Sequence, residues 1–116
     1  MSAIHELSAA ELAAQYRRGA LSPVEVSATL LARIDTWEPA LNAMYRINRE
    51  AALAQARAAE ARWRDGTSLS ALDGVPVTIK ENIATRGDPA PIGTRANEDA
   101  PPAAVDAPPA ARLREA

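Results

Sequence analysis

Hydrophobic and polar residues alternate with helical periodicity through the first half of the chain. Two helix starts share one signature, a serine followed three residues later by a glutamate, at Ser8 and at Ser22. In such a capping box, each of the two side chains satisfies a backbone N–H group of the first turn. The pattern predicts helices over about 8–18 and 22–37, with Pro39 following the second.

A third helix is predicted over about 49–64, with Asn48 as its cap. One face of this helix carries small apolar side chains and one aromatic: Ala52, Ala56, Ala59 and Trp63. An alanine-rich face permits close packing against another element. Residues 41–47 fit either a short strand or an extended link, and the pattern does not decide between the two. The helical region is therefore expected to cover about 8–64.

The pattern changes after Gly66. A turn signal at Asp73-Gly74 precedes an apolar run that predicts a strand over about 75–80, with alternate side chains on opposite faces. Six of the nine prolines lie between residues 87 and 109, so a proline-rich coil is predicted over about 87–105. The start of a last helix is predicted within about residues 106–116.

Composition excludes several classes of protein. The chain has 116 residues, a net charge of −2, no cysteine and a single histidine. We therefore expect no disulfide framework, no metal site and no cofactor. We also expect no membrane or nucleic-acid partner, because no run approaches the roughly 18 apolar residues of a membrane span and no basic patch is evident. The expected location is cytoplasmic.

The apolar side chains are mostly small. They make up 47% of the chain, yet there is no Phe and only two Trp and two Tyr. Because the hydrophobic term scales with buried area, at about 25 cal/mol per Å², such a chain builds a thin core. It is expected to be the outer part of something larger, and a homo-oligomer is compatible with this.

Lys80 is the candidate for chemistry. It is the only lysine among thirteen Lys and Arg residues, and it ends the apolar run of the predicted strand. A lysine can lose its proton when it is desolvated, whereas an arginine effectively never does. The alternative is a lysine at the end of a strand that simply reaches solvent.

The residues around Lys80 form a longer motif. The run from Leu72 to Ile83, LDGVPVTIKENI, resembles the signature segment of the amidase signature family. The resemblance extends upstream through 22–26 and 41–43 and downstream through Ile92-Gly93-Thr94 to the predicted helix of 106–116. It thus covers essentially the whole chain in the family's order.

The resemblance implies an α/β fold, a mixed central sheet flanked by helices, to which this chain supplies N-terminal helices and one core strand. It implies hydrolysis of linear amides by a serine–cis-serine–lysine triad, in which Lys80 acts as the base through a bridging serine. Neither family serine has a counterpart among the serines of this chain. Residues 1–116 are accordingly expected to be an N-terminal fragment of a single amidase domain, cut before the Gly/Ser-rich active-site segment and inactive alone.

Two other interpretations stay open. The chain could be a short non-catalytic binding module that keeps the family's outer shell, which a stable fold at this length would favour. It could also belong to the A-type subunit of a tRNA-dependent amidotransferase. Because nothing basic or aromatic suggests tRNA contact, the sequence ranks this below an amidase with a small amide substrate.

Overall fold

The computed structural model describes residues 2–116, and the chain divides between Pro76 and Val77 into two compact units. The regular structure of both is helical. The first unit contains a short 3-10 helix η1 (Ile4–Glu6) and three α-helices, α1 (Ala9–Arg17), α2 (Pro23–Leu41) and α3 (Arg49–Asp65). The second contains a 3-10 helix η2 (Arg95–Asn97) and α4 (Pro108–Glu115).

Serine caps start the first two α-helices, as the sequence predicts. The hydroxyl of Ser8 accepts a hydrogen bond from the Glu11 N–H at 3.3 Å, and the hydroxyl of Ser22 accepts one from the Glu25 N–H at 3.1 Å. Both glutamates complete the capping box by accepting from the serine backbone. Asn48 is the N-cap residue of α3, as predicted, but its side chain makes no capping bond to the helix and accepts from Arg46 Nε at 3.2 Å.

Helix α2 runs past the end that the sequence predicts. Pro39 lies inside it rather than after it, and the helix ends at Leu41. The last turn closes because the Asn42 N–H donates to the Glu38 carbonyl at 2.8 Å, with Asn42 in the left-handed conformation at φ 47°. The Glu38 carboxylate then accepts from the Met44 N–H at 2.7 Å. Residues 43–48 form a link without strand structure.

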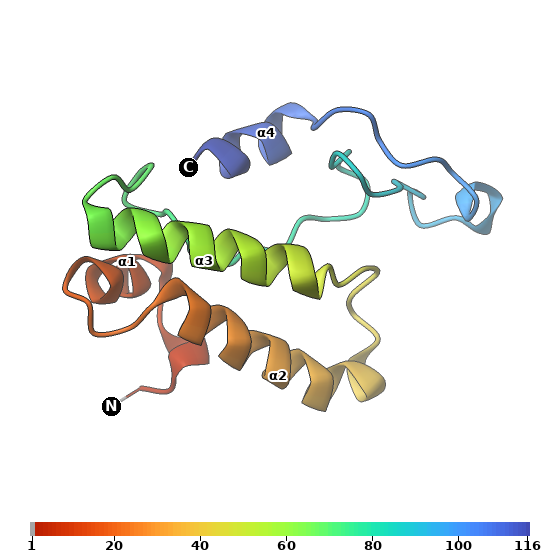
Figure 1. The fold of residues 1–116 in the computed structure, drawn as a ribbon. Helices are drawn as coiled ribbons and strands as arrows, with labels where there is room; N and C mark the ends of the chain where they lie inside the picture. Colours follow the sequence, from red (N-terminus) through yellow and green to blue (C-terminus); the bar gives the residue numbers. More distant parts are fainter. Residues whose placement is uncertain (1) are drawn as a thin grey trace. The chain divides into compact units, whose positions relative to one another are not determined.

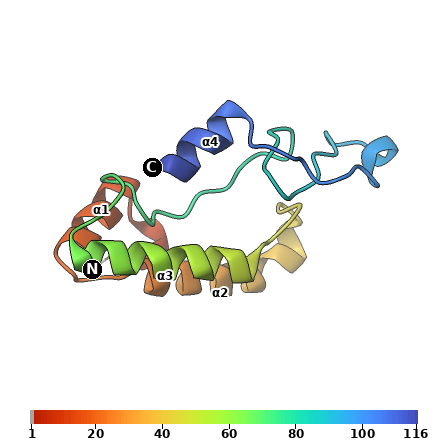
Figure 2. The same ribbon diagram turned by 45° about the horizontal axis from the view of Figure 1, so that its top comes forward.

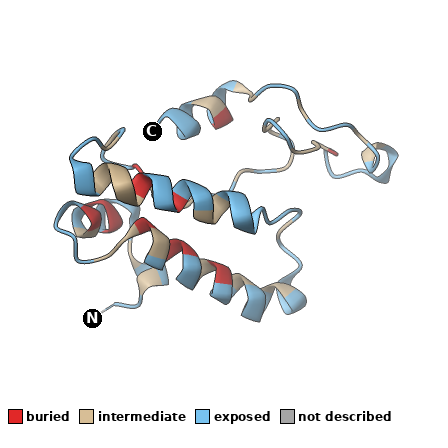
Figure 3. Ribbon diagram, viewed as in Figure 1, coloured by how far each residue is buried: buried red, intermediate tan, exposed pale blue. Residues whose placement is uncertain are grey.

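The core of the first unit lies where its helices meet. Helices α2 and α3 lie side by side and antiparallel, and α1 packs against α3 (Figures 1 and 2). The buried cluster is Leu12, Tyr16 and Val26, and Ala56 and Ala59 line the predicted alanine face of α3 (Figure 3). The close approach of two helices thus depends on small side chains, as the sequence suggests.

The predicted α/β fold is wrong for this chain. The described residues contain no strand, and Val75 to Lys80 runs extended without pairing. A strand needs a neighbour to share its backbone hydrogen bonds, and residues 2–116 supply none beside this run. The nearest approach to a sheet is one isolated parallel bridge between Arg86 and Ala103 in the second unit.

Helix α4 begins close to its predicted start, but its first turn differs. Ala107 is the N-cap, and Asp106 does not cap it. The Asp106 carboxylate instead accepts from the Arg86 N–H at 2.8 Å and from the Arg114 guanidinium at 2.7 and 3.1 Å. These bonds hold the pKa of Asp106 at about 2, the Arg114 guanidinium being the larger cause. Asp106 therefore joins α4 to the coil at Arg86.

None of the helices among residues 2–116 has the length and apolar character needed to cross a bilayer.

Candidate active site around Lys80

The segment that leads to Lys80 begins at a buried ion pair. The Asp73 side chain is only 3% exposed, and its two oxygens accept from Arg62 Nε and Nη2 of α3, both at 2.7 Å. One of them also accepts from the Leu69 N–H at 3.0 Å. The bonded Arg62 guanidinium holds the pKa of the Asp73 carboxyl below its usual value near 3.8, against the opposing effect of burial. Asp73 therefore fixes the loop of residues 69–73 onto α3.

Two aromatic side chains bind the same stretch of backbone. The Trp63 indole donates to the Asp73 carbonyl at 2.8 Å, and the Tyr16 hydroxyl donates to the Gly74 carbonyl at 3.2 Å. Their rings pack at a tilt with centroids 6.3 Å apart. Burial raises the pKa of Tyr16 to about 12. Side chains from α1 and α3 thus hold two consecutive carbonyl groups.

Gly74 also packs closely against α2 and α3. Its φ is +83°, and a Cβ placed there would lie 2.8 Å from Pro23 Cγ and 2.9 Å from Ala59 Cβ. Only glycine combines that backbone conformation with so close an approach. We call the set formed by Tyr16, Arg62, Trp63, Asp73 and Gly74 the anchor.

Lys80 itself lies in the second unit, in a different setting from the one that the sequence predicts. Its side chain is exposed, and its carbonyl accepts from the Ile83 N–H at 3.0 Å. Lys80 therefore opens a β-turn and does not end a strand. The alternate valines of the predicted strand do not share one buried face. Val75 packs against the first unit's core, whereas Val77 is 56% exposed. Residues 2–116 thus do not supply the desolvation that a lysine base needs.

A second β-turn lies beside the one that Lys80 opens. The Pro91 carbonyl accepts from the Thr94 N–H at 3.2 Å, and the central residues Ile92 and Gly93 both have positive φ, 55° and 63°. The Glu81 carboxylate reaches this turn, with Oε1 3.6 Å from the position of a Cβ on Gly93. Thr94 caps η2 by accepting from the Ala96 N–H at 3.2 Å. The motif residues after Lys80 and those of the later loop are therefore neighbours.

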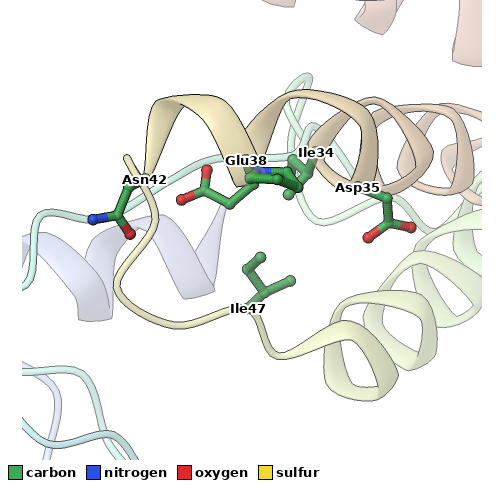
Figure 4. A pocket seen from close by; sticks show the side chains of 6 residues that line it. Ile34, Asp35, Glu38, Asn42 and Ile47 are labelled. Carbon is green, nitrogen blue, oxygen red and sulfur yellow. The ribbon is translucent and has the colours of Figure 1, made fainter.

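One groove of the first unit lies away from the Lys80 segment in sequence. It is an open groove of about 440 Å³ between the end of α2 and the start of α3, lined by Ile34, Asp35, Glu38, Pro39, Asn42 and Ile47. Figure 4 shows Ile47 facing Ile34 and Glu38 across it. Both acids already have partners, because Asp35 pairs with Arg49 at 2.5 Å and Glu38 caps the Met44 N–H.

The family assignment follows from comparison with known proteins. The family model described as Amidase matches residues 25–116, which include every residue of the anchor except Tyr16, together with Lys80 and both turns. The chain belongs to the amidase family. The amidase match contains most of the ordered series of motifs from which the sequence analysis drew its resemblance.

The most informative relatives of this amidase chain share one name, that of the A-type subunit of glutamyl-tRNA(Gln) amidotransferase. The protein of Chloroflexus aggregans is 42% identical over 95 residues, and that of Streptomyces coelicolor is 40% identical over 95 residues. Each match covers 82% of this chain, but only 20% and 19% of the relative. The protein of Nitratidesulfovibrio vulgaris is 40% identical over the entire chain, which corresponds to 23% of its own length. The chain thus spans about a fifth of these curated relatives.

These relatives correct one prediction. The sequence analysis predicts a small amide as partner and excludes nucleic acid, but the matched amidase relatives are named for a tRNA. The exclusion was wrong because it was drawn from the charge of residues 1–116 alone. The basic groups that contact phosphates can lie anywhere in a protein, and the segment matched here is only about a fifth of the relatives' length.

The anchor is what sequence reasoning missed. It treats Asp73 as part of a turn signal and Trp63 as part of an apolar face, and it assigns no role to Tyr16 or Arg62. A usable signal was present, because an acid directly before a motif glycine and an arginine beside an aromatic residue are both candidates for pairing. The spacing of ten residues between Trp63 and Asp73 gave no indication that they meet.

Proposed function

We propose that the chain is part of the A-type subunit of a tRNA-dependent amidotransferase. This is an enzyme of amidase type that releases ammonia from an amide donor. The observation that carries the proposal is the shared name of the relatives, at 40–42% identity through the Lys80 motif. This was the alternative interpretation of the sequence, and the comparisons favour it over a general amidase.

In this proposal Lys80 is the catalytic base. It takes the proton from a nucleophilic serine through a second serine, and the serine oxygen then attacks the amide carbonyl. The proton returns to the amide nitrogen, which leaves as ammonia when the C–N bond breaks, and water then hydrolyses the acyl-serine. Both serines would lie outside residues 1–116. So would the apolar side chains that desolvate a lysine and thereby favour its neutral form. The domain would then extend beyond this chain, and residues 1–116 would not cleave amides alone.

The deciding experiment uses the native protein that contains residues 1–116. It measures conversion of glutamyl-tRNA(Gln) to glutaminyl-tRNA(Gln), with either glutamine or ammonium chloride as the nitrogen source. We expect Lys80→Ala to lower the glutamine-dependent rate by about 10²–10⁴-fold, the usual contribution of a general base. The ammonia-dependent rate should stay unchanged, because free ammonia needs no amide cleavage. Arg95→Ala, which removes a cation with a 96% exposed side chain in the same unit, is the control.

The second candidate is an amidase for small linear amides, which the match to the amidase family as a whole also supports. The same preparation is assayed with acetamide, propionamide and benzamide. Hydrolysis of these amides that depends on Lys80, without any conversion of glutamyl-tRNA(Gln), would favour this candidate. A protein inactive in both assays would contradict both candidates and favour a binding role.

A further inference from the structure

A series of hydrogen bonds, each between 2.8 and 3.0 Å long, joins residues 84–88 to residues 103–107 in the second unit. The donors are backbone N–H groups: Ala107 to the Ala84 carbonyl, Arg86 to the Asp106 carboxylate, Gly87 to the Ala103 carbonyl and Ala103 to the Asp88 carbonyl. We call this set of bonds the clasp. Asp106 is the residue that takes part in it through a side chain. A substitution at Asp106 can therefore weaken the clasp and leave its backbone groups in place.

The Asp106 side chain is itself fixed by α4. Arg114 Nε donates to one carboxylate oxygen at 2.7 Å, and Nη2 donates to the other at 3.1 Å. Such a two-bonded arginine–carboxylate pair sets the orientation of the acid as well as its charge. The Asp106 side chain is only 10% exposed, so water competes little for these bonds. The same carboxylate thus joins the clasp to the helix that follows it.

The clasp begins directly after the turn that Lys80 opens. That turn closes with the bond from the Ile83 N–H to the Lys80 carbonyl, and Ile83 is followed at once by Ala84 of the clasp. The Thr85 hydroxyl also donates to the Ile83 carbonyl, at 3.3 Å. The chain between Lys80 and the clasp is therefore a hydrogen-bonded segment, and a shift of residues 84–86 would carry the Lys80 backbone with it.

A base acts only from a narrow range of positions. It must reach the proton that it removes at hydrogen-bond distance, and a displacement of about 1 Å can cost on the order of 10²-fold in rate. The Lys80 side chain is exposed in residues 2–116, so its location follows from the backbone that carries it. Whatever fixes that backbone therefore affects the rate.

We propose that Asp106 is a positioning residue for Lys80. Its bonds to the Arg86 N–H and to Arg114 fix the backbone after the lysine against the start of α4. The proposal rests on the catalytic role proposed for Lys80, and Asp106 acts only through the backbone. Loss of Asp106 should therefore slow the cleavage of the amide donor and spare the later use of ammonia.

The test replaces Asp106 in the native protein that contains residues 1–116 and compares the glutamine-dependent and ammonia-dependent rates. We expect Asp106→Ala to lower kcat with glutamine by about 10- to 100-fold, with KM for glutamine within a factor of about two, as for a displaced base. The ammonia-dependent rate should not change. Asp106→Asn keeps an acceptor for the Arg86 N–H but loses the charge-assisted bonds to Arg114, so its kcat should fall by only about 3- to 10-fold.

Two arginines of α4 provide a matched pair of variants. Arg112 pairs with Glu115 at 2.7 Å, the same distance as the shorter Arg114 bond, but these two side chains are 72% and 62% exposed. Arg114→Met should lower the glutamine-dependent kcat as Asp106→Asn does, whereas Arg112→Met should change neither rate. These variants carry the comparison if Asp106→Ala does not fold.

Hydrogen exchange in the same preparation measures the turn itself. In Asp106→Ala, the Ile83 N–H should exchange about 10-fold faster, because the open clasp no longer holds the turn. The Asn97 N–H donates to the Thr94 carbonyl within the loop at 3.2 Å and should exchange as before.

Three results would overturn the proposal. The first is a glutamine-dependent kcat that Asp106→Ala leaves unchanged. The second is an equal fall in the glutamine-dependent and ammonia-dependent rates, which would show that Asp106 only maintains the fold. The third is an equal loss in the Arg112 and Arg114 variants. If the wild type uses no glutamine, the proposed function fails separately, and the exchange of the Ile83 N–H still decides whether Asp106 fixes the backbone at Lys80.

Discussion

Gly74 concentrates two constraints in a single residue. Its φ of +83° disfavours any residue with a side chain, and atoms of Pro23 and Ala59 lie within 2.9 Å of its Cβ position. Gly66, at φ +72°, shares the first constraint but has nothing within 4 Å of its Cβ position. The two glycines therefore separate the cost of backbone conformation from the cost of close packing.

We predict that Gly74→Ala lowers the free energy of unfolding by about 2–4 kcal/mol, from backbone strain and overpacking together. Gly66→Ala should cost about 1 kcal/mol, from strain alone. Urea denaturation followed by Trp63 fluorescence, in a Trp37→Phe background, measures both. Equal losses at the two positions would contradict the tight packing of Gly74 against α2 and α3.

Tyr16 gives the anchor a spectroscopic signal. Burial raises its pKa to about 12 from the usual value of 10.0, because the ionised form is disfavoured in the core. In a Tyr45→Phe background, Tyr16 is the only tyrosine. We expect its absorbance near 295 nm to change only as the pH approaches 12. The stabilisation from its neutral form should be complete below pH 10 and lost as the pH rises toward 12. A midpoint near 10 in the folded protein would contradict the burial of Tyr16.

At the scale of elements, α3 holds the loop of residues 69–73 mainly through Arg62. Removing this guanidinium leaves the Asp73 carboxylate, whose side chain is 3% exposed, without its charged partner. We predict that Arg62→Met lowers the free energy of unfolding by about 2–3 kcal/mol, less than a fully buried pair because the Arg62 side chain is 30% exposed. Arg64→Met removes an arginine two residues away whose side chain is 71% exposed, and should change stability by less than about 0.5 kcal/mol. Similar losses in the two variants, in urea denaturation, would contradict the anchor.

Element prediction from sequence succeeded where short-range signals decide. The capping boxes at Ser8 and Ser22 each act within four residues. The apolar periodicity of α3 can likewise be recognised from the sequence of that helix alone. It failed where a distant partner decides. Pro39 would end an isolated pattern, but Asn42 and Glu38 close the last turn around it. The extended run after Gly74 has the alternation of a strand, yet strand formation needs a neighbour that no local pattern reveals.

At the scale of the whole molecule, each unit contains a carboxyl group that accepts two hydrogen bonds from an arginine: Asp73 from Arg62 and Asp106 from Arg114. Asp73 in the first and Asp106 in the second both have a pKa below the usual value near 3.8, Asp106 at about 2. A group whose pKa is lower in the folded state stabilises it above the unfolded value and loses that contribution as the pH falls. The contribution of Asp106 is therefore expected to be complete above about pH 4 and to be lost between about pH 4 and 2. That of Asp73 should likewise be lost as the pH falls below the usual value near 3.8.

We expect acid titration to show these losses separately. Trp63 fluorescence reports on the first unit, and the NMR signals of the Arg86 and Ala107 amides report on the second. Asp73→Asn should weaken the pH dependence of the first signal only, and Asp106→Asn that of the second only. A variant that alters both signals would contradict the assignment of one carboxyl group to each unit.

Lys80 is a candidate because a dense local motif marks it, and the family match includes that motif. Its catalytic role stays a prediction. Its surroundings were not predictable. The approach of Glu81 to Gly93 joins residues twelve positions apart, and the exposure of Lys80 depends on which segments surround it, so no local pattern reveals either. The tRNA in the relatives' name could not be predicted either, because this chain aligns with only about a fifth of those relatives and its charge does not indicate what the rest of them contacts.

The anchor also has a consequence for the order of events during synthesis. The bond from the Tyr16 hydroxyl to the Gly74 carbonyl joins residues 58 positions apart. At roughly 5–20 residues per second, a ribosome needs about 3–12 s to add that much chain. Helices α1 and α2 can form within microseconds of emerging, yet their buried faces must wait seconds for the residues that complete the core. The first unit therefore has a built-in interval in which its apolar surface is open to chaperones or to aggregation.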